Sequence, residues 1–184
     1  MPPASAERRK YARLTRSLHW IVAVMVLATL PIGYSMVQEG LERPTQNLLF
    51  ILHKNGGVIL LVLVLMRIAW RLMVPAPPMP AHIPGWQAKV AKTVQFGLYT
   101  LLLVMTISGY VRVRAGGFPI EMLDPLGLPG FIPRSDALAA TAKAVHANAR
   151  FLLVGLMLLH IAAGMKHLLA RDGIFGRIWP PLGR

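Results

Sequence analysis

The chain has 184 residues, of which 55% are hydrophobic and only 15% are charged, and its mean hydropathy is +0.53. A soluble domain carries about a quarter charged residues, so this composition excludes an ordinary soluble protein and indicates a membrane protein of one domain, 1–184. Twenty Lys and Arg stand against seven Asp and Glu. In so apolar a chain this excess indicates loop charges that set membrane topology and argues against nucleic acid as a partner.

Four apolar segments follow one another along the chain, each close to the roughly 20 residues that a helix needs to cross the hydrocarbon core of a bilayer. They are residues 18–37, 48–70, 94–111 and 151–169. The connections are rich in proline and glycine, as in "VPAPPMPAHIPGW" and "AGGFPIEMLDPLGLPGFIPRSD", so helix cannot run through them. We therefore expect an all-α membrane protein, a four-transmembrane-helix bundle in the lipid bilayer.

The basic residues predict the orientation of this bundle. Thirteen of the twenty Lys and Arg lie at the N-terminus, around the connection between the second and third segments, or at the C-terminus. Seven lie near the other two connections. Because basic loops stay in the cytoplasm, both termini should be cytoplasmic. A basic start before an apolar run also fits a signal peptide, but this run is long and no A-x-A-like site follows it.

Histidines are the chemically distinctive residues. The chain has no cysteine, which excludes disulfides, iron–sulfur clusters and thiolate metal sites. The six histidines are His19, His53, His82, His146, His160 and His167. His82 belongs to the proline-rich connection, and the other five lie in or beside apolar segments. A histidine at membrane depth is a candidate functional residue, and the alternative is a hydrogen bond to a neighbouring helix or a side chain that reaches the interface.

The spacing of four histidines predicts two pairs. His146 and His160 are fourteen residues apart, which on a helix places them about 40° apart around the axis and about 21 Å apart in depth. His19 opens the first segment on the cytoplasmic side, and His53 opens the second segment on the periplasmic side. We therefore pair His19 with His160 near the cytoplasm, and His53 with His146 near the periplasm.

Two imidazoles that face each other across a helix bundle suit the iron of a six-coordinate haem b, and bundle interiors often hold such cofactors. Zinc is the alternative metal, since imidazole is also a good zinc ligand. A structural zinc ion, however, requires four ligands at one place, whereas these histidines separate into pairs at two depths.

Five stretches form a recognisable pattern: "LHW" at the start of the first segment, "HKNGG" at the start of the second, "RIAWRLMVPAPPMP" at its end, "SGY" at the end of the third, and "LLHIAAGMKHLLARDGIFGRIWP" near the C-terminus. Together they resemble the bacterial cytochrome b561 family. The resemblance covers about residues 11–180. It implies a di-haem b cytochrome of the bacterial inner membrane, crossing it several times, with haem iron held axially by His19, His53, His146 and His160.

The resemblance also implies a function in electron transport. The first hypothesis is an oxidoreductase of the respiratory chain that links the ubiquinone pool to a small periplasmic redox partner, with superoxide as a candidate donor. The second is an electron carrier, a cytochrome b subunit that serves a separate dehydrogenase. The third, from another class, is a histidine-rich membrane protein that binds zinc.

Some residues depart from the family pattern or have two interpretations. Gln95 stands where many members have a histidine. His167 matches a histidine that is common in the family; here it either reaches the interface and faces lipid, or contacts a haem propionate or a quinone head group. Five arginines at segment ends suit haem propionates, or equally topology and lipid phosphate: Arg16, Arg67, Arg71, Arg112 and Arg150. Five glycines allow either a haem or a second helix to approach closely: Gly33, Gly56, Gly57, Gly109 and Gly155.

Overall fold

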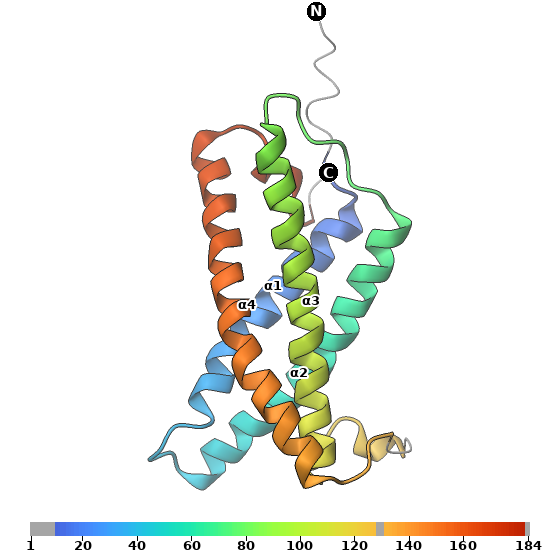
Figure 1. Cartoon of the computed structure of the whole chain (residues 1–184), viewed down its shortest axis with the longest axis vertical. Helices are drawn as coiled ribbons and strands as arrows, with labels where there is room; N and C mark the ends of the chain where they lie inside the picture. The colour runs from blue at the N-terminus through green and yellow to red at the C-terminus, as the bar shows by residue number, and fades with distance from the viewer. Residues whose placement is uncertain (1–9, 128–130, 183–184) are drawn as a thin grey trace, which may run out of the picture.

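Four long helices make up most of the structure, a computed structural model that describes residues 10–127 and 131–182 (Figure 1). They are α1 (Arg13–Ser35), α2 (Arg43–Met73), α3 (Gly85–Ala115) and α4 (Asp136–Ala170), with the short 3-10 helices η1 (Asp124–Leu126) and η2 (Phe175–Arg177). The described residues contain no strand. Each long helix is long and apolar enough to cross a membrane, which confirms the predicted all-α bundle of four transmembrane helices.

All four long helices begin before the apolar segments that predicted them, and α1 ends two residues earlier than its segment. α4 begins at Asp136, well before the apolar segment 151–169, and this added part of the helix carries His146. Two local signals explain the early start. The Oγ of Ser135 accepts a hydrogen bond from the N–H of Leu138 at 3.3 Å and caps the helix, and alanine, the best helix former, dominates the first turns. A search for long apolar segments cannot detect a helix end that is polar or rich in alanine.

The packing leaves space between the first and last helices. α3 packs along α4 and α2, and α1 packs along α2, whereas α4 comes close to no long helix other than α3 in the described chain. A small apolar core joins the middle of the bundle, formed by Val22, Val26, Leu60, Val64, Leu102 and Leu153. Most other large apolar side chains point outward, as a bilayer requires; Leu72 and Leu169 are 81% and 75% exposed.

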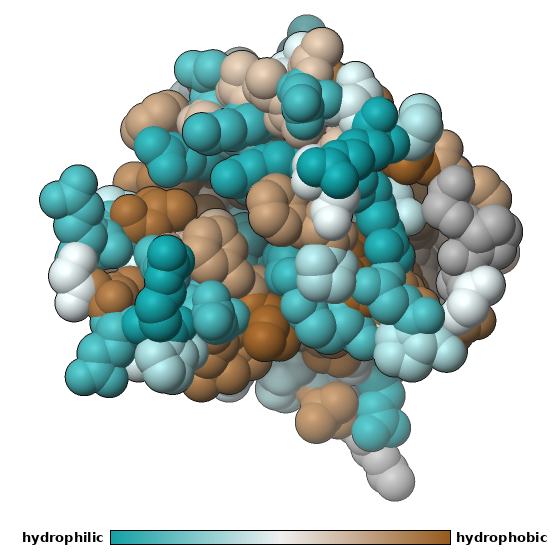
Figure 2. All heavy atoms as spheres, turned by 90° about the horizontal axis from the view of Figure 1, so that it is seen from below, coloured by the Kyte–Doolittle hydropathy of each residue, from teal (hydrophilic) through white to brown (hydrophobic). Residues whose placement is uncertain are grey.

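Both ends of the described chain lie at one end of the bundle, which we call the terminal end (Figure 1). There the N–H of Tyr11 donates to the carbonyl oxygen of Arg177 at 3.0 Å, and the indole N–H of Trp20 donates to that of Ile178 at 3.1 Å. The opposite end, which we call the loop end, carries the α1–α2 and α3–α4 connections. Figure 2 shows hydrophilic side chains over much of the loop end, as expected of a face in water.

Candidate functional site

The structure brings together both predicted histidine pairs. His19 of α1 faces His160 of α4 near the terminal end, with ring centroids 6.1 Å apart and ring planes at 75°. His53 of α2 faces His146 of α4 near the loop end, with centroids 6.2 Å apart and planes at 86°. Each pair therefore spans the space between α4 and a helix that does not pack against it. His82 is exposed on the connection between α2 and α3.

The apolar core separates the two pairs. On α1, Val22 and Val26 lie between His19 and the residues that contact His53, and on α4 Leu153 lies midway between His146 and His160. Fourteen residues of helix correspond to a depth difference of about 21 Å. The molecule thus holds two similar sites, one above the other, with apolar packing between them.

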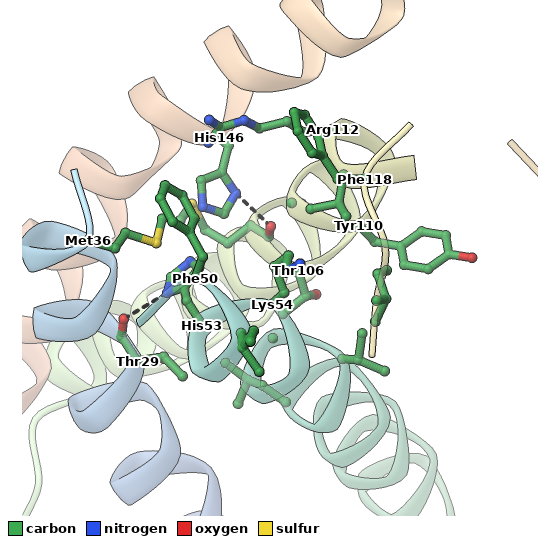
Figure 3. Close-up of a pocket in the computed structure, with 18 of the residues that line it drawn as sticks. Thr29, Met36, Phe50, His53, Lys54, Thr106, Tyr110, Arg112, Phe118 and His146 are labelled. Atoms are coloured by element: carbon green, nitrogen blue, oxygen red, sulfur yellow. Dashed lines mark hydrogen bonds between the residues drawn. The ribbon is translucent and has the colours of Figure 1, made fainter. Parts of the chain in front are cut away.

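A cavity of about 570 Å³ adjoins the His53–His146 pair (Figure 3). Phe50, Met36 and Thr106 line it together with the two histidines. Four residues of the core also line it: Val26, Leu60, Leu102 and Leu153. Its volume is in the range of cofactor and ligand pockets, and its walls are mostly apolar. The loop-end pair therefore adjoins a cavity that suits a large planar cofactor.

Backbone carbonyl groups fix the orientation of both loop-end rings (Figure 3). The Nδ1 of His53 lies 3.1 Å from the carbonyl oxygen of Thr29, and the Nδ1 of His146 lies 2.9 Å from that of Met105. A carbonyl oxygen can only accept, so each Nδ1 carries the proton and donates it. The Nε2 of each ring then keeps a free lone pair, which is the arrangement of histidines that bind metals. The Oγ of Ser108 lies 3.2 Å from the His146 Nδ1.

The terminal-end pair lacks such partners. The Nδ1 of His19 is shielded from solvent and has no hydrogen-bond partner within the described residues. His160 likewise makes no hydrogen bond there. A buried polar atom without a partner is rare in folded proteins and indicates a missing ligand, ion or water. The ring of Trp20 lies edge-on to that of His19, with centroids 5.4 Å apart.

Two of the five singled-out glycines make room for the histidines themselves. A Cβ on Gly33 would lie 2.5 Å from His53 Cε1, and one on Gly109 would lie 3.2 Å from His146 Cε1. A Cβ on Gly56 would lie 3.2 Å from Thr29 Cγ2, so this glycine allows α2 to approach α1 closely. The glycines that meet no atom within 4 Å of such a Cβ include Gly57 and Gly155. Their sequence positions alone did not distinguish these roles.

Lys54 and Asn55, the two residues after His53, bind the α3–α4 connection at Glu121 and its neighbours and hold it over the cavity; we call these contacts the latch. Lys54 Nζ donates to Glu121 Oε1 at 2.7 Å and to the carbonyl oxygen of Pro119 at 2.8 Å. The side-chain amide of Asn55 donates to Glu121 Oε2 at 3.0 Å, and its Oδ1 accepts from the N–H of Met122 at 3.0 Å. This segment, residues 116–127, brings Ile120 into the cavity wall at 1% exposure. Sequence reasoning missed this latch, although "HKN" was among the motifs.

The charge of Glu121 is part of this latch. Burial alone would raise the pKa of its carboxyl, but the hydrogen bonds from Lys54 and Asn55 outweigh that effect and hold the pKa below its usual value. A second ion pair, Arg114 to Asp124 at 2.6 Å, holds the same segment, and the other carboxylate oxygen of Asp124 accepts from the N–H of Ile120 at 3.0 Å.

A histidine–aspartate pair lies at the terminal end. His167 Nδ1 is 2.5 Å from Asp172 Oδ2, and Asp172 Oδ1 accepts from the N–H of Ile174 at 3.1 Å. Burial would raise the pKa of the Asp172 carboxyl, but the hydrogen bonds from His167 and Ile174 lower it below its ordinary value. The carboxylate is therefore charged at neutral pH and fixes the imidazole of His167. Gln95, where many relatives have histidine, is exposed on α3.

The donor sets fit haem iron better than zinc. A metal–imidazole bond is about 2 Å, so two rings on opposite sides of one ion have centroids roughly 6 Å apart. The observed 6.1 and 6.2 Å match this arrangement. Within residues 10–127 and 131–182, no three His, Cys, Asp or Glu side chains gather as metal ligands, whereas a tetrahedral zinc site requires four.

The chain is similar to known proteins over most of its length. The model of the family described as prokaryotic cytochrome b561 matches residues 10–181. "Cytochrome b561 homolog 2" of Escherichia coli K12 is 28% identical over 159 residues, covering 86% of this chain and 84% of that protein. "Probable superoxide oxidase CybB" of Yersinia pestis is 27% identical over 177 residues, covering 94% and 97%.

Proposed function

The chain belongs to the prokaryotic cytochrome b561 family, which implies haem b binding, and we propose that it carries electrons between ubiquinone and a small periplasmic redox partner through two b haems. It is a multi-pass bacterial membrane protein, and we assign it to the inner membrane. One observation supports the proposal above others. Two pairs of imidazoles face each other at 6.1 and 6.2 Å across a space that the helices leave open.

In this proposal His19 and His160 would hold one haem, and His53 and His146 would hold the other. When bound, the two haems supply one-electron carriers at two depths of the membrane. The carbonyl groups of Thr29 and Met105 hold the loop-end rings with Nε2 pointing away from their hydrogen bonds. With imidazoles on both sides, no open position remains for a substrate. Donor and acceptor therefore exchange electrons at the two ends of the bundle.

The distribution of basic residues supports an orientation with both termini in the cytoplasm. Thirteen of the twenty Lys and Arg belong in the sequence to the N-terminal segment, to the α2–α3 connection and its flanks, or to the C-terminal segment. By the positive-inside rule this end faces the cytoplasm, and the loop end, with the His53–His146 pair, faces the periplasm. An electron that enters at the loop end then crosses most of the membrane before it leaves.

The His167–Asp172 pair is our candidate proton donor for ubiquinone. Because Nδ1 of His167 donates to Asp172, its Nε2 is the nitrogen left to exchange a proton with a substrate. Reduction of one ubiquinone takes two electrons and two protons. Protons drawn from the cytoplasmic surface would pass through this imidazole, which Asp172 keeps in one tautomer, as a carboxylate does in other catalytic histidine pairs.

Superoxide is our candidate electron donor at the loop end. Each superoxide loses one electron and leaves as O₂, so two are consumed for each ubiquinone reduced to ubiquinol. Arg112 lies within electrostatic reach of both loop-end rings, and Arg150 within reach of His146. Such cations attract a small anion from solution. The name of the Yersinia pestis relative gives the same donor for that protein.

A haem count on purified protein tests the ligand proposal. We expect two b haems per chain by pyridine haemochrome, about one in His160→Ala and in His146→Ala, and two in His82→Ala, which removes an exposed histidine. The two ligand variants should lose different spectral components. One haem in the wild type, or a count that neither ligand variant changes, would refute the paired arrangement.

Stopped-flow kinetics tests the reaction. The protein in detergent with a ubiquinone analogue should accelerate superoxide decay and form ubiquinol, with a rate that falls as salt is added because the attraction is screened. A protein that retains both haems without accelerating the decay would exclude superoxide as the donor. Stable co-purification with a dehydrogenase would then favour the cytochrome-subunit hypothesis.

A further inference from the structure

Two arginines near the terminal-end histidines have no acidic partner. Arg67 and Arg71 lie four residues apart on α2, hence about 40° apart on one helix face. Both are partly buried, and Arg67 lies within electrostatic reach of both His19 and His160. The Nε of Arg67 and the Nη1 of Arg71 are shielded from solvent and lack a hydrogen-bond partner within the described chain.

Aromatic rings, not carboxylates, hold these guanidinium groups. Arg67 lies over the ring of Tyr99, 5.2 Å from its centroid, and Arg71 lies over that of Tyr11 at 5.5 Å. No ion pair within the described residues includes either arginine. Stacking on a ring orients a cation and leaves its N–H groups directed elsewhere, but it does not neutralise the charge.

The acidic residues of the described chain are positioned elsewhere. Five lie at the loop end: Glu39, Glu42, Glu121, Asp124 and Asp136. Of the other two, Asp172 is engaged by His167 and Ile174, and Glu7 lies outside the described residues. Two cations at the edge of the hydrocarbon region, without a counter-charge, are costly. The arrangement therefore calls for an anion with more than one acceptor oxygen that is not part of the described chain.

We infer that Arg67 and Arg71 bind the propionate carboxylates of the haem held by His19 and His160, an inference that rests on the proposed function. A haem b carries two propionates on one edge, and arginine is the side chain best suited to carboxylates because its N–H groups donate in a planar fork. Arg67 is close to the paired imidazoles, and Arg71 lies one turn nearer the cytoplasm. The terminal-end haem thus points its acidic edge toward α2 and the cytoplasmic surface.

A comparison of haem b with its dimethyl ester tests this assignment directly. The background is His146→Ala, which leaves the terminal-end site alone, and bound cofactor is measured by absorbance titration of the haem-free full-length protein in detergent. The ester keeps the ring and the iron but has no carboxylate charge. We expect the ester to bind about tenfold to a hundredfold more weakly than haem b, the effect of losing charge-assisted hydrogen bonds.

Arginine variants locate the effect. Arg67→Gln and Arg71→Gln should weaken binding of haem b and leave ester binding unchanged, so that the preference for haem b shrinks. Ester binding also reports that each variant is folded. Arg67→Lys keeps the positive charge but not the planar pair of N–H donors, so it should retain part of the preference for haem b over the ester. The matched control is Lys92→Gln, which removes an exposed cation from α3 at the same end.

Each outcome is distinct. Equal affinity for haem b and its ester in the background protein would overturn the assignment. In that case, a loss of co-purified phospholipid phosphorus in Arg67→Gln would indicate that the arginines bind lipid phosphate instead. A preference for haem b that persists in both glutamine variants would also overturn it. No binding of either cofactor would instead refute the proposed terminal-end haem site itself.

Discussion

Gly33 on α1 lies directly against the imidazole of His53 on α2, so close that a Cβ at this position would be 2.5 Å from His53 Cε1. Side chains do not tolerate such a contact, and the ring cannot retreat without breaking its Nδ1 hydrogen bond to Thr29. The absence of a side chain at residue 33 is therefore a condition for the position of this histidine.

Gly33→Ala should displace His53 and remove the haem we assign to the loop end. We expect the haem count to fall from two to about one, with loss of the same spectral component as in His53→Ala. The control is Gly164→Ala, where a new Cβ meets no atom within 4 Å. Gly109→Ala should be milder, because its Cβ would lie 3.2 Å from His146 Cε1. Full haem content in Gly33→Ala would show that the ring can shift freely.

The latch over the loop-end cavity should weaken in acid. Because the folded-state pKa of Glu121 is depressed, its contribution is fully present above its unfolded value of about 4.3 and is lost as pH falls through the folded pKa. Hydrogen exchange of residues 118–126, corrected for intrinsic rates, should therefore be steady from pH 8 to pH 5 and faster below about pH 4. Glu121→Gln should lose this acid dependence.

At neutral pH we expect Glu121→Gln to have only a modest effect on the stability of the latch. An ion pair with one partner a third exposed contributes about 0.2–1 kcal/mol, so protection of the Met122 amide should fall by only a few fold. Glu39→Gln, an exposed carboxylate on the α1–α2 connection, is the control and should leave this segment unchanged. An acid dependence that persists in Glu121→Gln would assign it to another group, with Asp124 the next candidate.

Asp172→Asn should slow ubiquinone reduction without loss of haem. The amide preserves the shape of the carboxylate but carries no charge, so it no longer stabilises the imidazolium from which Nε2 would give its proton to the quinone. We expect turnover to fall by about tenfold or more while KM for the quinone changes little. The measurement is steady-state kinetics with an artificial electron donor. If turnover is unchanged and both haems remain, protons reach the quinone by another route.

Much of the architecture was predictable because apolar length and histidine spacing are properties of single segments. The pairing of His19 with His160 and of His53 with His146 followed from helix periodicity and depth, and the structure places the two rings of each pair 6.1 and 6.2 Å apart. Whether they bind haem stays a prediction. The carbonyl partners at Thr29 and Met105 could not be predicted, since a backbone acceptor has no residue signature.

The other features that sequence reasoning missed depend on contacts between distant segments. The latch joins Lys54 to Glu121, 67 residues away, and nothing local distinguishes this lysine from one that sets topology. Gly33 resembled a helix-crossing glycine until the position of a second helix was known. Arg67 and Arg71 were singled out as candidates, but only the positions of the acidic residues in the described chain leave the two arginines without a carboxylate partner.

Arg177 should stabilise the closure of the terminal end more than its single charge suggests. It is 5% exposed, and its Nη2 donates to the carbonyl oxygens of Pro77 and Pro78, each at 2.9 Å, which ties the C-terminal segment to the α2–α3 connection. Arg177→Ala leaves both acceptors without this donor, so we expect a loss of roughly 2–4 kcal/mol, seen as a lower apparent Tm. Arg177→Lys should recover only part of the lost stability, because an ammonium group lacks the planar arrangement of N–H donors that a guanidinium has. The control is Lys166→Ala, which removes an exposed cation at the same end. A Tm of Arg177→Ala equal to that of the wild type would contradict the stabilising role of Arg177.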